Sequence, residues 1–345
     1  MALEKSVLTD TIISDLLMKH YGIHFASAQK LELGTANCYR VFDGKKYYFL
    51  KEFQSSFSVN EILQEAELLE FLSESDIPTT RFYKTVQNEY VVEYENHLVC
   101  LEEYIEGQAY NYDNLPCHLL PQVAKMLGKQ HYVLRDYPLP IDMSDEWLNS
   151  FSSDKVIAEY DALIEIAKSK DNDKYIPQII EDLEYKKQLA VRCEEYKKYY
   201  NEITYCATHG DYQGCQMIFY GEEVKAIIDF SSASTLPVTW EIMRSYVQSS
   251  EQCRSNANID IDGFCDYVRE YMKYSKLTKA DMISMPYVYL FQLARSKYGY
   301  PQYLKTDSPD KDKLLQFAFW RTQMCREVEQ KAETISNELL NLLIW

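Results

Sequence analysis

The sequence predicts an α+β protein in two parts, an antiparallel sheet with one helix followed by a mostly helical remainder. The chain has 345 residues, more than twice the roughly 150 of a typical domain, so two lobes are expected. Its 46% apolar and 26% charged residues are usual for a globular protein. Strand-like segments concentrate in the first third, and helical periodicity dominates from about residue 115. We therefore expect an N-terminal lobe over residues 1–107 and a C-terminal lobe over residues 108–345.

The first lobe begins with an expected helix over residues 9–20, and Gly22 is suited to end it. Two strand-like runs follow, joined at Asp43-Gly44, which predicts a hairpin with a type I′ turn. The apolar spacing then predicts a helix over residues 59–72, closed off by Pro78. Three further strands are expected in TRFYKTV (80–86), EYVVEY (89–94) and HLVCLEEYI (97–105).

The second lobe reads as helices, interrupted by one β-like segment over residues 217–230. Residues 184–200 combine many charged residues with apolar ones, which is typical of an amphipathic helix with a solvated face.

Composition excludes several classes of partner. The 53 acidic residues against 36 basic ones give a net charge of −17, which repels nucleic acid and anionic lipid. No run of 18 apolar residues predicts a membrane span. Nine cysteines without a C-x-x-C pair, and six unclustered histidines, argue against a disulfide framework or a zinc site. We expect a cytoplasmic protein that binds neither nucleic acid nor membrane; the oligomeric state is left open.

The segment THGDYQGCQMIF (208–219), followed by AIIDF (226–230), is the most informative. Asp211 follows a glycine, Gln216 enters a strand, and Asp229 ends the returning strand. A short hairpin would bring Gln216 and Asp229 together, and oxygen ligands of this kind suit Mg²⁺. Asp211 would then stand nearby to accept a proton from a hydroxyl. Each motif alone could be a turn capped by its aspartate, but both motifs in this order favour the functional interpretation.

At these residues the chain resembles the aminoglycoside phosphotransferase and choline kinase group. The pattern H-G-D-x-x-x-x-Q, followed by I-D-F, is similar to the group's catalytic and metal motifs. The resemblance implies a protein-kinase-like two-lobed fold, with ATP or GTP and Mg²⁺ as cofactors and a small-molecule hydroxyl as phosphoryl acceptor. It extends to the segments LGTANCYRV (33–41), EAELLEFL (65–72), LVCLEEYIEGQ (98–108) and LGKQH (127–131).

The resemblance also implies roles for individual residues. Asp211 would orient and deprotonate the acceptor hydroxyl, while Gln216 and Asp229 would hold Mg²⁺. Lys51 would contact the nucleotide phosphates, with Glu65 orienting it. The remaining nucleotide-binding residues would be Thr35, Ala36 and Asn37 in the loop between the first two strands, and Glu102 and Tyr104 in the hinge that receives the base through backbone groups.

The charges near Lys51 support this assignment independently. A lysine in a buried strand needs a partner, because an unpaired buried charge is costly. Glu65 and Glu67 both lie on the next helix, about 200° apart around its axis, so only one can point inward. The alternative is that Lys51 is simply an exposed strand residue.

Glu241, which opens a helix after the I-D-F motif, is expected to hold the catalytic loop in place. His131 and His209 are expected to be structural.

Two departures from the family pattern keep a second hypothesis open. Gln216 stands where the family usually has asparagine, and Ser231 stands where an acidic residue is common. The alternative is a catalytically degenerate kinase-like protein, either a nucleotide-binding protein or a spore-coat-type structural protein.

If the protein is an active kinase, the acidic residues of the second lobe would favour an amine-bearing acceptor.

Overall fold

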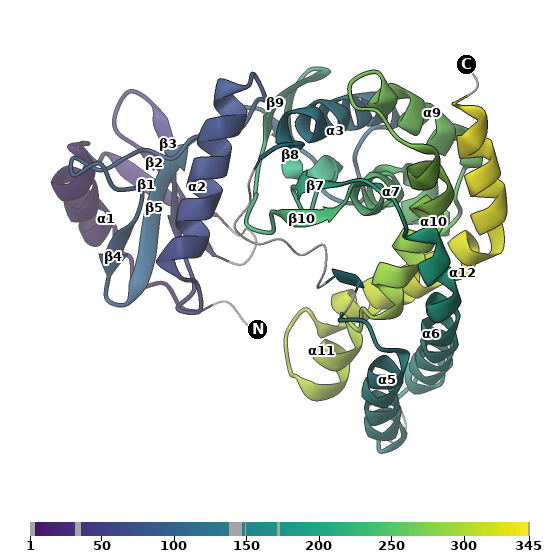
Figure 1. Ribbon diagram of the computed structural model, residues 1–345. Helices are drawn as coiled ribbons and strands as arrows, with labels where there is room; N and C mark the ends of the chain where they lie inside the picture. Colours follow the sequence, from purple (N-terminus) through teal and green to yellow (C-terminus); the bar gives the residue numbers. More distant parts are fainter. Residues whose placement is uncertain (1–3, 32–35, 138–146, 149, 171–172, 344–345) are drawn as a thin grey trace. The chain divides into compact units, whose positions relative to one another are not determined.

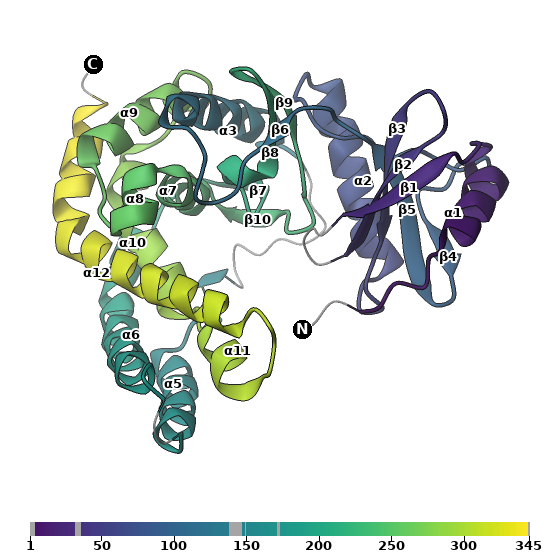
Figure 2. The ribbon, with the colours of Figure 1, turned by 180° about the vertical axis from the view of Figure 1, so that it is seen from behind.

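The computed structural model describes residues 4–31, 36–137, 147–148, 150–170 and 173–343 (Figure 1, Figure 2). The chain divides into two compact units. Unit 1 comprises Met1–Ala109 and Gln216–Ala233, and unit 2 comprises Tyr110–Cys215 and Ser234–Trp345. The predicted α+β class, with a sheet-rich first part and a mostly helical second part, is confirmed.

Unit 1 is built on a five-stranded antiparallel sheet with the strand order β1-β2-β3-β5-β4. Its strands are β1 (Ser27–Leu31), β2 (Asn37–Phe42), β3 (Tyr47–Glu52), β4 (Val92–Tyr94) and β5 (His97–Glu103). The hairpin between β2 and β3 is confirmed, but its turn type differs from the prediction. Asp43 donates its backbone N–H to the Lys46 carbonyl, and of the two residues between them only Gly44 has positive φ, at 96°. The turn therefore centres on Gly44 and Lys45, as in type II′, rather than on Asp43 and Gly44.

Two helices cover opposite faces of this sheet (Figure 1). The helix α1 (Asp10–Leu16) continues as a π-helical turn over Leu17–Tyr21 and ends at Gly22, whose φ is 65°. Its apolar side chains pack with Val41, Leu50 and Leu101 of the sheet. On the other face, α2 (Val59–Glu74) begins with a capping box formed by Ser58 and Glu61, and Ile62 packs against Phe53 and Leu98.

The segment 80–86, expected as a strand, forms only a short irregular pairing. The N–H of Tyr83 donates to the Leu101 carbonyl and the N–H of Glu103 to the Arg81 carbonyl. A turn then follows, in which Thr85 Oγ1 accepts from the N–H groups of Gln87 and Glu89. This local side-chain bonding ends the pairing after one bridge, which explains why the strand-like residue types did not produce a strand.

A second, three-stranded sheet completes unit 1. It contains β6 (Gln108–Ala109), β8 (Met217–Tyr220) and β9 (Glu223–Ile227), in the order β6-β8-β9. The predicted β segment at 217–230 is thus confirmed as a hairpin. The N–H of Ile227 donates to the Pro78 carbonyl, which fixes the end of β9 beside the residues that follow α2.

Unit 2 surrounds the helix α7 (Val238–Ser249), of which nearly every residue is buried. A two-stranded ladder of β7 (Tyr205–Thr208) and β10 (Ser234–Pro237) leads into it. Gly128 allows two helices to lie close together, because a Cβ there would lie 2.5 Å from the Tyr271 carbonyl oxygen. The other helices are α3 (Leu120–Leu134), α5 (Ser153–Lys168), α6 (Ile176–Tyr196), α8 (Glu251–Asn256), α9 (Ile261–Met272), α10 (Lys279–Ala294), α11 (Tyr300–Lys305) and α12 (Lys311–Asn341).

The helix α6 is amphipathic as expected, but its buried face includes one charged residue of the predicted solvated segment. Lys186 is 2% exposed, and its ammonium group donates to the carbonyls of Leu293 and Ser296 at 2.8 and 2.6 Å. Within the described parts of the chain, no helix is long and apolar enough to span a membrane.

Candidate active site

Lys51 lies on β3 with its side chain 15% exposed, and its ammonium nitrogen is 4.0 Å from Glu65 Oε2. Glu65 is buried on α2, whereas Glu67 points to solvent. The structure therefore places Glu65, and not Glu67, beside the lysine. The Phe53 ring lies 5.0 Å from the same ammonium nitrogen and closes off one side of it.

Three carboxylates surround this single lysine. Burial alone would lower the pKa of Lys51, but Glu65, Glu102 and Asp229 together raise it. Burial raises the pKa of Glu65 to about 7, against the opposing effect of Lys51, and burial also raises the pKa of Glu102. Three carboxyl groups, of which Glu65 and Glu102 are buried and Asp229 is exposed, outnumber the single lysine, so the cluster carries surplus negative charge when they are ionised. A divalent cation would neutralise that surplus and favour the ionised forms.

Glu102 enters the site through its side chain, which the sequence did not reveal. Its carboxylate accepts from Thr80 Oγ1 at 3.3 Å and from the thiol of Cys100 at 3.7 Å, and it acts electrostatically on Lys51. Residues alternate between the two faces of a strand, and β5 pairs with β3 over Leu50↔Leu101 and Phe49↔Glu102. The sequence analysis expected Glu102 to bind the nucleotide base only through its backbone. Its side-chain position follows from the register of β3 and β5, which the sequence does not specify.

The predicted metal ligands lie together at the open end of the β8–β9 hairpin. The amide Nε2 of Gln216 donates to Asp229 Oδ2 at 3.5 Å. Ser231, which stands where relatives often carry an acidic residue, donates its hydroxyl to Asp229 Oδ1 at 2.7 Å. Asp229 has a φ of 65°, a left-handed backbone conformation that aspartate adopts more readily than most residues.

This donor set fits Mg²⁺. The carboxylate of Asp229 and the amide oxygen of Gln216 can share one ion once the amide turns its oxygen inward, and Mg²⁺ commonly takes only one or two protein groups. Within the described residues, no group of three or more His, Cys, Asp or Glu side chains is arranged to hold a metal.

Of the remaining nucleotide-binding candidates, the structure describes Ala36, Asn37 and Tyr104. Thr35 lies outside the described residues. Ala36 and Asn37 are buried, Asn37 begins β2, and its side-chain amide donates to the Glu4 carbonyl at 3.1 Å. Tyr104 follows the end of β5, with its ring 5.7 Å from that of Tyr47.

The loop that carries Asp211 is fixed by Glu241, as expected. Both Glu241 and His131 are 1% exposed. The Glu241 carboxylate accepts from the backbone N–H groups of His209 and Gly210 at 3.2 and 2.6 Å, and it lies 2.8 Å from His131 Nε2. Burial alone would raise the pKa of Glu241, but the hydrogen bond from His131 and the neighbouring donors lower it. Gly210 has a φ of 80°, which lets the loop turn directly before Asp211.

Asp211 is held by two side chains that the sequence analysis did not single out. Arg244 of α7 makes an ion pair with Asp211 Oδ1 and donates to the Tyr212 carbonyl at 3.1 Å. Gln213 donates to Asp211 Oδ2 at 3.4 Å and to the hydroxyl of Tyr112 at 2.9 Å. Arg244 lies three residues after Glu241 on the same helix, so helical spacing was the signal that could have found it.

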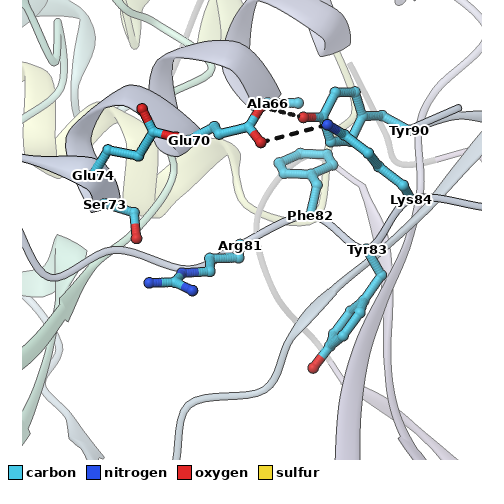
Figure 3. Close-up of a pocket in the computed structure, with 9 residues that line it drawn as sticks. All are labelled: Ala66, Glu70, Ser73, Glu74, Arg81, Phe82, Tyr83, Lys84 and Tyr90. Atoms are coloured by element: carbon cyan, nitrogen blue, oxygen red, sulfur yellow. Dashed lines mark hydrogen bonds and ion pairs between the residues drawn. The ribbon is translucent and has the colours of Figure 1, made fainter. Parts of the chain in front are cut away.

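A pocket of about 370 Å³ lies elsewhere in unit 1, between α2 and residues 81–90 (Figure 3). Glu70 contacts Lys84 and Tyr90 at its rim, and Glu74 adds a second carboxylate. It shares no residue with the predicted site, and its two carboxylates are matched by the basic side chains of Arg81 and Lys84. We therefore do not assign it to the chemistry.

Unit 1 thus holds the lysine–glutamate pair and the hairpin that carries the predicted metal ligands, and unit 2 holds Asp211 on a loop fixed by Glu241. The chain belongs to the phosphotransferase enzyme family, whose model matches residues 27–272. This confirms the family resemblance seen in the sequence: the protein is a small-molecule phosphotransferase that acts on hydroxyl groups.

Solved structures show the same fold at low sequence identity. A spectinomycin phosphotransferase, solved with ADP and spectinomycin, is 16% identical with a TM-score of 0.69, covering 94% of this chain and 100% of its own. An amicoumacin kinase, solved with AMP-PNP and Ca²⁺, is 14% identical with a TM-score of 0.63, covering 94% of each chain. A microcompartment-associated aminopropanol kinase is 15% identical with a TM-score of 0.62, covering 96% of this chain and 100% of its own. A search of curated proteins finds no significant match.

Proposed function

We propose that this phosphotransferase transfers the γ-phosphoryl group of ATP or GTP to a hydroxyl of a small molecule, with Mg²⁺ as the metal. The observation that carries the proposal is the loop before Asp211, which Glu241 holds in place. Glu241 fixes the backbone on the N-terminal side of Asp211, and the Asp211 carboxylate remains 36% exposed. A rigidly held and accessible carboxylate is what orientation of an acceptor hydroxyl requires.

In this proposal unit 1 binds the nucleotide and the metal. Lys51 contacts the phosphates and Glu65 fixes its position. The backbone groups of residues 101–104 receive the base, and Gln216 with Asp229 holds Mg²⁺. When bound, Mg²⁺ supplies charge neutralisation for the phosphates. The surplus of negative charge around Lys51 supports a cation at this place.

Unit 2 supplies the acceptor half of the reaction. Asp211 Oδ2 accepts the hydroxyl proton as the oxygen of the acceptor attacks the γ-phosphorus, and the ion pair with Arg244 fixes the orientation of the carboxylate. Asp211 and Gln216 are five residues apart in the sequence, so the proposed base and the proposed metal ligand lie in one continuous segment of the chain. None of the nine cysteines, all of which the structure describes, is in a disulfide, which supports a cytoplasmic location for this chemistry.

The proposal is tested with a panel of hydroxyl-bearing small molecules, using either ATP or GTP as donor. The readout is ADP or GDP release together with mass spectrometry of the acceptor, and reactions without Mg²⁺ are the control. We expect at least one acceptor to gain a phosphoryl group in a Mg²⁺-dependent reaction. Nucleotide binding without any acceptor-dependent release would instead support the catalytically degenerate alternative.

A further inference from the structure

Gln213 is a buried glutamine two residues after Asp211, and only one end of its amide is paired. The residue is 1% exposed. Its Nε2 donates to Asp211 Oδ2 at 3.4 Å and to the Tyr112 hydroxyl at 2.9 Å, so both N–H bonds are used. Its Oε1 is buried as well, and among the residues that the structure describes no donor reaches it.

Asp211 dictates which end of the amide faces the site. An ionised carboxylate only accepts hydrogen bonds, so an amide turned the other way would place Oε1 against Asp211 Oδ2, oxygen against oxygen. The Tyr112 hydroxyl can bond to either end of an amide, because it both donates and accepts. The unpaired Oε1 of Gln213 is therefore a direct consequence of its bond to Asp211.

This orientation is unfavourable for stability. A buried acceptor without a donor is costly, and such atoms are uncommon in native proteins. The fold gains little from the two bonds in return, because Asp211 is 36% exposed and Tyr112 is 41% exposed, so both partners of Gln213 reach solvent. Local arrangements that cost stability are found mainly at functional sites, which points to a functional reason for this one.

The bond from Gln213 complements the ion pair from Arg244. Arg244 holds Asp211 Oδ1, and Gln213 donates to Oδ2, so the carboxylate is held at both of its oxygens. Oδ2 is the oxygen that accepts the proton in the proposed function. Without Gln213, this oxygen loses a donor that limits the rotation of the carboxylate, and the geometry of attack depends on that rotation.

Tyr112 holds the other side of the Gln213 amide. Its ring lies 6.0 Å from that of Phe317, which in turn stacks on Trp320 with ring centres 5.4 Å apart. This aromatic packing keeps the Tyr112 hydroxyl beside Gln213. Burial raises the pKa of Tyr112 to about 12, so at neutral pH the hydroxyl stays protonated while its oxygen accepts from Nε2. Tyr112, Gln213 and Asp211 thus form one hydrogen-bonded chain within unit 2.

We propose that Gln213 is a positioning residue for phosphoryl transfer, which orients Oδ2 of Asp211 while Tyr112 holds its amide in place. This inference rests on the proposed function and adds two residues to that site. It assigns Gln213 no part in nucleotide binding and no net contribution to stability. A structural glutamine would differ in the second respect, which makes the two roles separable.

The first test replaces Gln213 with methionine, which fills a similar volume without a donor or an unpaired acceptor. Q213M should lower kcat by about tenfold or more and leave the KM for nucleotide unchanged. It should also unfold at the same or a higher temperature than wild type, because the unpaired Oε1 is removed. The control is Q323M, at an exposed position of α12. A clearly lower Tm in Q213M, or an unchanged kcat, would overturn the proposal.

The second test uses pH to return a donor to this position. In Q213E an ionised carboxylate cannot donate to Asp211, whereas a protonated carboxyl group donates once, and the nearby charge of Asp211 favours the protonated form. The ratio of Q213E turnover to wild-type turnover should therefore rise as the pH falls from about 8 to about 5. The same ratio for Q213M should stay constant. A Q213E ratio that is flat or falls over this range contradicts the proposed role.

A double-mutant cycle tests the part played by Tyr112. If Tyr112 acts through Gln213, Y112F lowers the kcat of wild type but does not lower that of Q213M further. An equal loss in both backgrounds would refute the chain from Tyr112 to Asp211. Failure of the proposed function has a different signature, because D211N would then transfer phosphoryl groups no more slowly than wild type. Failure of this inference alone leaves D211N impaired and Q213M fully active.

Discussion

At the scale of single residues, charge explains how Lys51 and Asp211 are held. Lys51 lies among three carboxyl groups, whereas Asp211 forms an ion pair with Arg244. In the proposed function, Lys51 gains a compensating charge from the nucleotide phosphates, and the carboxyl groups beside it gain one from a divalent cation.

Replacing Lys51 with methionine should keep the fold and weaken phosphate positioning. We expect turnover to fall by about 10²-fold or more, the scale measured when one preorganised charge is removed from a transition state. The ammonium group is 4.0 Å from Glu65, and methionine preserves the apolar stem that packs near Phe53. Steady-state kinetics and circular dichroism provide the check. K30M, on β1 of the same sheet, is the control, and wild-type kinetics in folded K51M would refute the role of Lys51.

Gln216 provides the sharpest test of the metal assignment. If its amide oxygen binds Mg²⁺, Gln216→Asn should keep activity within about tenfold, because the ligand type survives and bound waters adjust. Gln216→Leu should require far more Mg²⁺ for half-maximal turnover. The Mg²⁺ dependence of nucleotide turnover in the three proteins is the measurement. A leucine variant that titrates like wild type would show that Gln216 does not contact the metal.

At the scale of elements, α7 is the part that organises unit 2. It is buried almost throughout and carries both Glu241 and Arg244, three residues apart on one face. Glu241 fixes the backbone before Asp211, and Arg244 fixes the carboxylate of Asp211 itself. A shift of this helix would therefore displace the whole catalytic loop.

Glu241→Gln should lower the free energy of unfolding by about 1–3 kcal/mol, because the amide cannot accept all the donors that the carboxylate satisfies. The pKa of Glu241 is lower in the folded protein than its usual 4.5, so its contribution is fully present above pH 4.5 and is lost as pH falls through the folded value. Urea unfolding between pH 3 and 8 should show the two proteins converging at low pH. E165Q, at an exposed position, is the control. A pH-independent difference would contradict this account.

The elements also show how far the sequence could predict the site. The hairpin carrying Gln216 and Asp229 was predictable, because two β-rich runs flank a glycine turn. Lys51 and Glu65 were predictable from the rule that a buried charge needs a partner. Glu102 was predicted only as a hinge residue acting through its backbone, and Arg244 was not predicted, because the placement of their side chains depends on strand register and on the burial of α7, which are tertiary properties. The segment 80–86 has strand-like residues, but the side chain of Thr85 turns the chain after one bridge.

At the scale of the whole molecule, the chemistry is divided between the two units. The hairpin with the metal ligands belongs to unit 1, although it follows the catalytic loop directly in the sequence. Unit 1 thus holds Lys51, Glu65, Glu102, Gln216 and Asp229, and unit 2 holds Asp211 with Arg244. We predict that nucleotide and metal affinity depend on residues of unit 1, and acceptor selectivity on those of unit 2.

The most direct test of this account is phosphoryl transfer by wild type and by Asp211→Asn, measured as phosphorylated acceptor and as nucleotide affinity. We expect Asp211→Asn to lower kcat by about 10²–10⁴-fold, the usual range for loss of a general base, while nucleotide affinity by calorimetry hardly changes. A variant that still transfers phosphoryl groups at the wild-type rate, or that loses nucleotide binding while turnover persists, would contradict the central claim.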